Sequence, residues 1–269
     1  MQNEPRSLSP AAILDSYNVL GEKKLSSPTL RLFLLGILAG FLIGMGAAVT
    51  NTATFAITNP SAAKIISALL FPLGLGIVML TGAELFTGNC MLIAPVLDGK
   101  GSVSHMLRNW AAVYTGNFLG AILLAFAMAA TGKLGASGGA LAAYTIELAT
   151  AKCSLPSGSA FVLGILCNIL VCLGVLCSLS ATDTFGRIAG AYLPVVFFVL
   201  CGFEHSVANM YYIPAGLFAA GLPGQSADPA VLSWGRFLVG NLLPVTMGNI
   251  AGGAGVILLL RFSHRQKAK

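Results

Sequence analysis

The feature that most constrains this chain is a series of six long apolar segments. Each reaches or exceeds the roughly 20 residues with which an α-helix crosses a hydrocarbon core about 30 Å thick. Their approximate limits are 30–57, 65–96, 107–131, 157–182, 187–217 and 231–261. Because only 9% of the residues are charged, against about a quarter in soluble domains, an ordinary soluble protein is excluded. The sequence predicts an all-α integral membrane protein with six transmembrane helices.

The apolar segments divide the chain into three parts. We predict a polar N-terminal segment at 1–28, a six-helix transmembrane channel domain at 29–262 and a basic tail at 263–269. Ser9 followed by Pro10 is a helix-start signal, so the N-terminal segment is expected to contain a short amphipathic helix at the membrane surface. A frayed tail is the alternative for this segment.

Lysine and arginine are unevenly distributed between the two sides of the predicted membrane domain. Eleven fall in the two terminal segments and in the loops between spans two and three and between spans four and five. The other four are Lys64, Lys133, Lys152 and Arg236. Since positive charge marks cytoplasmic loops, both termini are expected in the cytoplasm of a protein of the bacterial inner membrane. This orientation also explains the net charge of +6 without a nucleic-acid partner.

Two matching polar stretches interrupt spans two and five. The stretches 82–89 and 202–209 share the spacing Gly-x-Glu-x-x-x-x-Asn and lie 120 positions apart. A charged side chain at mid-membrane costs roughly 2.5–3.5 kcal/mol on insertion scales, so an ionisable residue there indicates a functional site. Each span is therefore predicted to consist of two half-helices joined by irregular backbone, which membrane proteins tolerate where it lines a cavity.

Further matches indicate that the chain is an internal repeat. Gly-Asn-x-x-Gly occurs at 116–120 and again at 248–252, and Gly-Ile-Leu occurs at 36–38 and again at 164–166. Three spans per repeat is an odd number, so the two halves must enter the bilayer from opposite sides. The sequence thus predicts a 3+3 inverted repeat, with a transport site where the two breaks meet.

The residue types at the breaks favour a small anion. A half-helix that begins at membrane depth directs free N–H groups and the positive end of its dipole into a cavity. Side-chain donors are added by Thr87, Asn89, His205 and Asn209. Glu84 and Glu204 would repel an anion, so we expect them to turn aside and accept hydrogen bonds from the freed backbone amides and from neighbouring side chains.

His205 and several apolar residues are candidates for the transport path. Histidine has an ordinary pKa near neutrality, so His205 can serve as a hydrogen-bond or proton donor; a simple buried histidine is the alternative. The apolar residues closest to the breaks are Phe71, Leu75, Leu85, Phe197 and Phe198. Apolar constrictions select small, easily desolvated solutes, although each of these residues taken alone is equally well explained by packing.

These residues together resemble the formate/nitrite transporter family, which also includes hydrosulfide channels. The resemblance covers roughly residues 10–262 and is most specific in the string Phe-Glu-His-Ser-x-Ala-Asn-Met at 203–210. It is supported by Glu-Leu-Phe-Thr-Gly at 84–88, Ala-Lys at 151–152 and Gly-Asn at 248–249. The resemblance implies a homopentamer with aquaporin-like protomers, each with its own pore for formate, hydrosulfide or nitrite, and with no cofactor.

The resemblance also implies roles for individual residues. Thr87 and His205 would face each other at the pore centre, and Lys152 would help to draw anions into the outer vestibule. Leu75 and Phe198, with Phe71 nearby, would form one constriction, and Leu85 would border the other. The polar residues at or behind the pore centre would be Asn168 and Asn249, with Glu84, Glu204, Asn89 and Asn209 in support. The N-terminal helix would be a cytoplasmic gate, and the loop from Thr87 to Leu92 would be mobile.

Three other classes of protein are considered. A proton-coupled small-anion carrier remains open, because a histidine beside a glutamate can move protons. An aquaporin-like channel for neutral solutes needs two Asn-Pro-Ala caps, and only 59–61 (Asn-Pro-Ser) comes close. An intramembrane serine protease would use Ser137 of the Gly-x-Ser-Gly string, but that string lies in a glycine-rich loop, so we expect no enzymatic activity. At residue 203, phenylalanine favours formate or hydrosulfide over nitrite.

Overall fold

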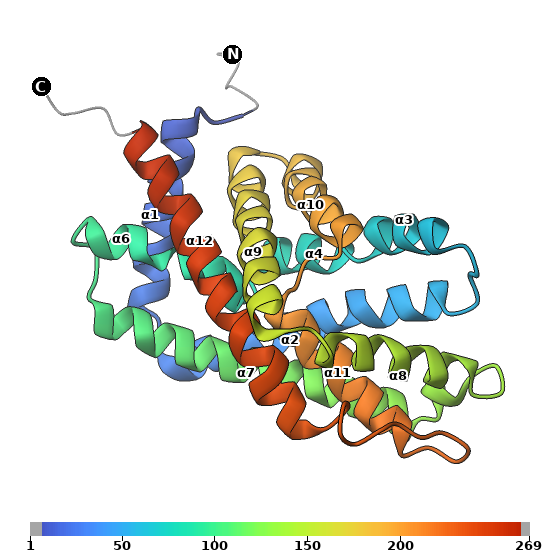
Figure 1. Cartoon of the computed structure of the whole chain (residues 1–269). Coiled ribbons are helices and arrows are strands. Elements are labelled where there is room, and N and C mark those ends of the chain that lie inside the picture. Colours follow the sequence, from blue (N-terminus) through green and yellow to red (C-terminus); the bar gives the residue numbers. More distant parts are fainter. Residues whose placement is uncertain (1–6, 265–269) are drawn as a thin grey trace, which may run out of the picture.

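The structure, a computed structural model, describes residues 7–264, and nearly all of this part is helical (Figure 1). Its α-helices are α1 (Pro10–Ser26), α2 (Thr29–Thr54), α3 (Pro60–Leu70), α4 (Leu73–Thr81), α5 (Phe86–Asn89), α6 (Ile93–Leu97), α7 (Val103–Ala130), α8 (Ala140–Cys153), α9 (Ser157–Ser180), α10 (Thr184–Cys201), α11 (Ser206–Ala220) and α12 (Leu243–His264). Short 3-10 turns η1 (Cys90–Leu92) and η2 (Lys133–Gly135) and a π-helical segment η3 (Arg236–Leu242) complete the set. Arg6, Arg265, Lys267 and Lys269, which entered the prediction of orientation, lie outside the described residues.

Six helical segments between residues 7 and 264 are long and apolar enough to cross a membrane, which confirms the predicted number. They are Thr29–Thr54, Pro60–Thr81, Val103–Ala130, Ser157–Ser180, Thr184–Cys201 and Arg236–His264. The second begins at Pro60 rather than near residue 65, because the Asn59 side chain caps the helix by accepting the Ala62 N–H at 3.0 Å. The chain is therefore a multi-pass membrane protein.

Two glycines end the helices at the predicted polar stretches. Gly82 (φ 68°) follows α4 and Gly202 (φ 71°) follows α10, both in the left-handed region that favours glycine. Helical structure resumes at Phe86 and at Ser206, so a few non-helical residues separate the half-helices. The second half-helices differ, since α11 has 15 residues whereas α5, η1 and α6 are short successive turns. The expectation of a loop from Thr87 to Leu92 is wrong, because these residues form helical turns.

The two halves of the chain pack in the same way. The long helices α2 and α7 lie against each other in the first half, as α9 and α12 do in the second. A Cβ atom on Gly120 of α7 would lie 2.0 Å from the carbonyl oxygen of Ile37, and one on Gly252 of α12 would lie 2.3 Å from that of Ile165. Only glycine permits so close an approach of two helices, which is how helices associate without a hydrophobic driving force in lipid.

Helices α1 and α8 close opposite sides of the domain, α1 beside α6 and α8 beside α11 (Figure 1). For α1 the helical interpretation is confirmed: Ser9 caps it by accepting the Ala12 N–H at 3.3 Å, and Tyr17 and Leu25 are buried. The frayed tail is wrong for this part of the chain. Helix α8 was expected only as an apolar helix from about 140 to 151 within a long loop, but it packs against the second broken span.

Replacing Gly252 with alanine should destabilise the protein by about 1–3 kcal/mol, because the added methyl group must displace the backbone of α9. We expect the melting temperature in detergent to fall by several degrees. Gly255→Ala, three residues further along α12, is the matched control, since its Cβ would meet nothing within 4 Å and alanine favours helix by up to about 1 kcal/mol. Equal melting temperatures for the two variants would contradict the proposed close contact.

Candidate functional site

Each break is held open by one buried asparagine. In the first half, the Oδ1 atom of Asn117 on α7 accepts the Phe86 N–H at 2.9 Å, the amide that α5 leaves free at its start. The Nδ2 atom of Asn117 donates to the carbonyl oxygens of Gly36 at 2.8 Å and Glu84 at 2.9 Å. A single side chain thus satisfies three backbone groups and ties α2, α7 and the break together.

The second half repeats these bonds. Asn249 on α12 accepts the Ser206 N–H at 2.9 Å and donates to the carbonyl oxygens of Gly164 at 2.8 Å and Glu204 at 3.0 Å. Each of the four participating positions has a counterpart 120, 128 or 132 residues earlier, at the offsets read from the sequence. The hydrogen bonds therefore follow the repeat, and Asn249 supports the break from behind.

The glutamate of the first break is paired with a lysine from the N-terminal helix. The Nζ atom of Lys24 donates to Glu84 Oε2 at 2.7 Å and to Asn89 Oδ1 at 2.8 Å, and Asn89 Nδ2 donates to the same carboxylate oxygen at 2.7 Å. Both partners of the ion pair are largely buried. Asn109 on α7 completes the cluster, since it accepts from Asn89 at 2.9 Å and donates to the Lys24 carbonyl oxygen at 3.2 Å.

The second break has the same cluster, built from α8 instead of α1. Lys152 donates to Glu204 Oε1 at 2.8 Å, and Asn209 donates to Glu204 Oε2 at 2.6 Å. Asn241 accepts from Asn209 at 2.8 Å and donates to the Lys152 carbonyl oxygen at 2.9 Å. The N-terminal helix and α8 are therefore equivalent elements of the two halves.

The expectation for the two glutamates is only partly right. They do turn to neighbouring side chains, as expected. They do not take the amides that open the second half-helices, because Asn117 and Asn249 accept the N–H groups of Phe86 and Ser206. Buried carboxylates need a cation, and lysines supply it.

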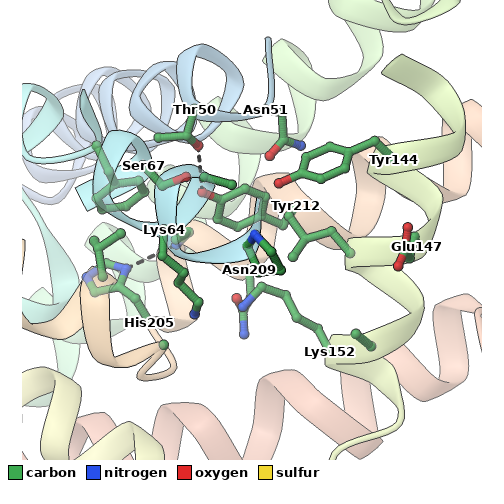
Figure 2. A pocket seen from close by; sticks show the side chains of 18 of the residues that line it. Thr50, Asn51, Lys64, Ser67, Tyr144, Glu147, Lys152, His205, Asn209 and Tyr212 are labelled. Atoms are coloured by element: carbon green, nitrogen blue, oxygen red, sulfur yellow. Dashed lines mark hydrogen bonds between the residues drawn. The ribbon is translucent and has the colours of Figure 1, made fainter. Parts of the chain in front are cut away.

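His205 and Thr87 meet where the two breaks face each other. The Nε2 atom of His205 lies 3.0 Å from Thr87 Oγ1, and the two residues are 3% and 0% exposed. The Nδ1 atom of His205 accepts the Ala208 N–H at 3.0 Å, so the imidazole caps α11 (Figure 2). An N–H must donate, so Nδ1 carries no proton, and the proton of the neutral ring is on Nε2, directed at Thr87.

Asn168 lies behind this pair and fixes Thr87 from the backbone side. Its Nδ2 atom donates to the carbonyl oxygens of Thr87 at 3.1 Å and Asn249 at 2.6 Å. Asn168 is fully buried in α9. The contact joins the first break to the helix that supports the second.

The predicted apolar residues surround the pair. Phe71 and Phe198 are in edge-to-face contact with centroids 5.8 Å apart, and Phe198 stacks on the His205 ring at 5.9 Å. Leu75 and Leu85 are 2% and 4% exposed. A small solute that reaches His205 must therefore pass between aromatic and aliphatic side chains.

A cavity of about 810 Å3, here called the vestibule, opens above these residues between α2, α3, α8, α10 and α11 (Figure 2). Phe71, Phe198 and His205 line it, as does Lys152. Thr87 and Leu75 are not among its lining residues and lie beyond Phe198 and His205. The vestibule is on the side of the molecule opposite to α1 and α6 (Figure 1).

Sequence reasoning did not assign a role to five residues that build this site. They are Tyr17, Lys24, Asn109, Asn117 and Asn241. Lys24 was counted only for orientation, and Asn117 was seen only as part of a repeated string. The signal was present, because Lys24 precedes Lys152 by 128 positions, and Asn109 precedes Asn241 by 132.

The residues of two alternative interpretations lie elsewhere. Asn59 and Pro60 form the exposed start of α3, with no matching string in the other half. Ser137 is exposed, with φ 55°, in the turn before α8. Among residues 7–264, no group of three or more His, Cys, Asp or Glu residues is arranged to hold a metal ion.

The comparisons with known proteins agree with this architecture. The sequence model described as "Formate/nitrite transporter" matches residues 11–263. A formate channel FocA of Haemophilus influenzae is 36% identical over 233 residues, which cover 82% of each chain. A probable formate transporter of Methanothermobacter thermautotrophicus is 35% identical over 264 residues, which cover 91% of this chain and 93% of the relative.

Solved structures give the same result. A structure described as "Pentameric formate channel with formate bound" aligns with a TM-score of 0.76 at 36% identity, over 87% of this chain and 96% of that one. An "FNT family ion channel" at 24% identity shares the fold with a TM-score of 0.83, over 95% of this chain and 99% of that one. The fold and the site define a membrane transport protein with six spans. The chain belongs to the formate/nitrite transporter family.

Replacing Asn249 with alanine should leave the Ser206 N–H and two carbonyl groups without partners at membrane depth. Each buried orphan costs roughly 1–3 kcal/mol, so we expect a large fall in the melting temperature in detergent and a smaller monodisperse fraction on size-exclusion chromatography. Asn117→Ala should behave alike. Thr115→Ala is the control, because Thr115 is bonded only within its own helix. A Thr115→Ala-like result for both asparagine variants would refute the bracing role.

Proposed function

We propose that this protein conducts small monovalent anions across the membrane, with formate or hydrosulfide favoured and nitrite as a further substrate. The observation that carries the proposal is the buried contact of 3.0 Å between His205 and Thr87, directly behind the apolar floor of the vestibule. Formate has the strongest support, because the 36%-identical structure has formate bound and the relatives described above are formate channels or transporters by name.

The path that we propose has three stages. An anion enters the vestibule, sheds water between Phe71 and Phe198, and is then met by the hydroxyl of Thr87 and the Nε2–H of His205. Leu75 and Leu85 form the apolar surroundings of the next stage. Apolar walls remove competing water, and the two donors replace part of the lost hydration.

His205 acts in this scheme as a hydrogen-bond donor. Its neutral ring has a single proton, on Nε2, because Nδ1 accepts the Ala208 N–H. To donate a proton, the ring must first become a cation with a proton on Nδ1, which removes the cap of α11. A proton-coupled carrier is the second candidate, supported by the position of His205 next to Glu204, and it requires this cost at each turnover.

The remaining polar residues have supporting roles. Glu84, Asn89, Glu204 and Asn209 hold the breaks in shape through the two lysine clusters. Lys152 lines the vestibule and adds positive charge there, although Glu204 at 2.8 Å offsets much of it. Helix α1 is proposed as a cytoplasmic gate, since Tyr17 donates to the Gly88 carbonyl oxygen at 3.2 Å beside Thr87.

Location and assembly complete the proposal. We place both termini in the cytoplasm and the protein in the inner membrane, on the asymmetry of lysine and arginine. A homopentamer is supported by the 36%-identical solved structure, whose channel is pentameric. Large apolar side chains exposed on the outer faces of α2, α7 and α12 provide surface for lipid and for neighbouring protomers.

Flux into proteoliposomes tests substrate and coupling together. Purified protein is reconstituted, and uptake of formate, hydrosulfide and nitrite is followed with and without an imposed pH gradient. A channel equilibrates the anion down its own gradient, whereas a proton-coupled carrier accumulates it when the pH gradient is present. Absence of flux for all three anions would overturn the proposal.

His205→Asn separates the two roles of the imidazole. Asparagine is a strong N-cap, so α11 should keep its start and the melting temperature should change little. A hydrogen bond to an anion contributes roughly 1.5–3 kcal/mol, so formate flux should fall by about tenfold or more and lose its pH dependence. His105→Asn, at an exposed site on α7, is the control. Unchanged transport at every pH would rule out a role of His205 in conduction.

A further inference from the structure

Lys64 on α3 is a cation of the vestibule to which no function has been assigned above. Its side chain lines the cavity and is exposed. Among residues 7–264 it has no hydrogen bond or ion pair. Lys152, the other lysine of this cavity, is paired with Glu204 at 2.8 Å and is largely buried. The two lysines therefore differ in the charge that a solute would encounter.

The ammonium group of Lys64 reaches the break that carries His205. A Cβ atom on Gly202 would lie 2.7 Å from Lys64 Nζ, so the lysine occupies the space that a side chain at 202 would fill. Gly202 precedes His205 by three positions. In the view of Figure 2, the Lys64 side chain extends between those of His205 and Lys152, away from its own helix.

The charges around the vestibule are arranged unevenly. Glu204 compensates Lys152, and the second carboxylate of the cavity, Glu147, is on α8 and has no ion-pair partner among the described residues. In Figure 2, Glu147 lies on the far side of the cavity from His205, whereas Lys64 lies near it. The uncompensated positive charge is thus at the entrance to the conduction site, and the uncompensated negative charge is remote from it.

We propose that Lys64 recruits the permeating anion and holds it at the entrance to the His205–Thr87 pair. The inference rests on the proposed function, since it names the residue that loads the same path. A lysine is a compact, flexible point charge, so it attracts any small anion without fixing its orientation. In a cavity with low-dielectric walls, one such charge raises the local anion concentration, and the effect weakens as salt screens it.

The test compares Lys64→Gln with wild type in proteoliposomes. Initial rates of formate uptake are measured against formate concentration at ionic strengths of about 0.01 M and about 1 M, where the Debye length is roughly 30 Å and 3 Å. We expect the half-saturating concentration to rise about three- to tenfold at low salt, with the maximal rate nearly unchanged. The difference should disappear at high salt, and Lys64→Arg should restore wild-type behaviour.

Lys133→Gln is the matched control. Lys133 lies in η2, outside the vestibule lining, is exposed, and loses the same charge. Lys152→Gln is unsuitable, because it would leave the buried Glu204 without its cation. If Lys64→Gln and Lys133→Gln give the same half-saturating concentration and the same salt dependence, the role of Lys64 is refuted, while wild-type formate flux still supports the proposed function.

A variant of opposite sign gives an independent test if Lys64→Gln does not yield folded protein. Glu147→Gln removes the remote negative charge and should lower the half-saturating concentration at low salt. No change would overturn the electrostatic account of the vestibule. Absence of formate flux in wild-type protein is a different result, because it contradicts the conduction of formate itself.

Discussion

The constraint on which this structure depends is that backbone groups at membrane depth need partners when a helix is interrupted. No bulk water is available there, so each freed N–H and carbonyl group must be satisfied by protein or face a cavity. Asn117 and Asn249 meet this requirement, each with three hydrogen bonds. With the breaks fixed in this way, Thr87 and His205 are brought into contact.

The scaffold is symmetric, but the site is not. Asparagine braces, lysine–glutamate pairs and glycine crossings recur in both halves at offsets of 120 to 132 positions. At the repeat offset of 120, however, His205 corresponds to Leu85 and Thr87 to Val207. Each half thus supplies one polar side chain to the centre and one apolar side chain to its counterpart position. The repeat builds the path, and the departures from it provide the chemistry.

Much of the fold could be read from the sequence, because its signals are local. Segment length and hydropathy predicted six spans, Gly82 and Gly202 marked the helix ends, and Ser9 marked the start of α1. The partners of Glu84 and Glu204 were harder to find. Lys24 and Lys152 are distant in sequence from these carboxylates, and a lysine in a polar flank has the same appearance whether it lies in solvent or reaches inward.

The sequence by itself determined that this chain crosses a membrane six times, that two spans are interrupted, and that polar side chains gather at the interruptions. These properties follow from the cost of placing charge and free backbone groups in hydrocarbon. Only the tertiary structure decided that asparagines take the freed amides, that α1 is the counterpart of α8, and that Lys64 is unpaired while Lys152 is not. Such choices depend on which groups meet across helices, and pairing between distant residues leaves no periodic trace along the chain.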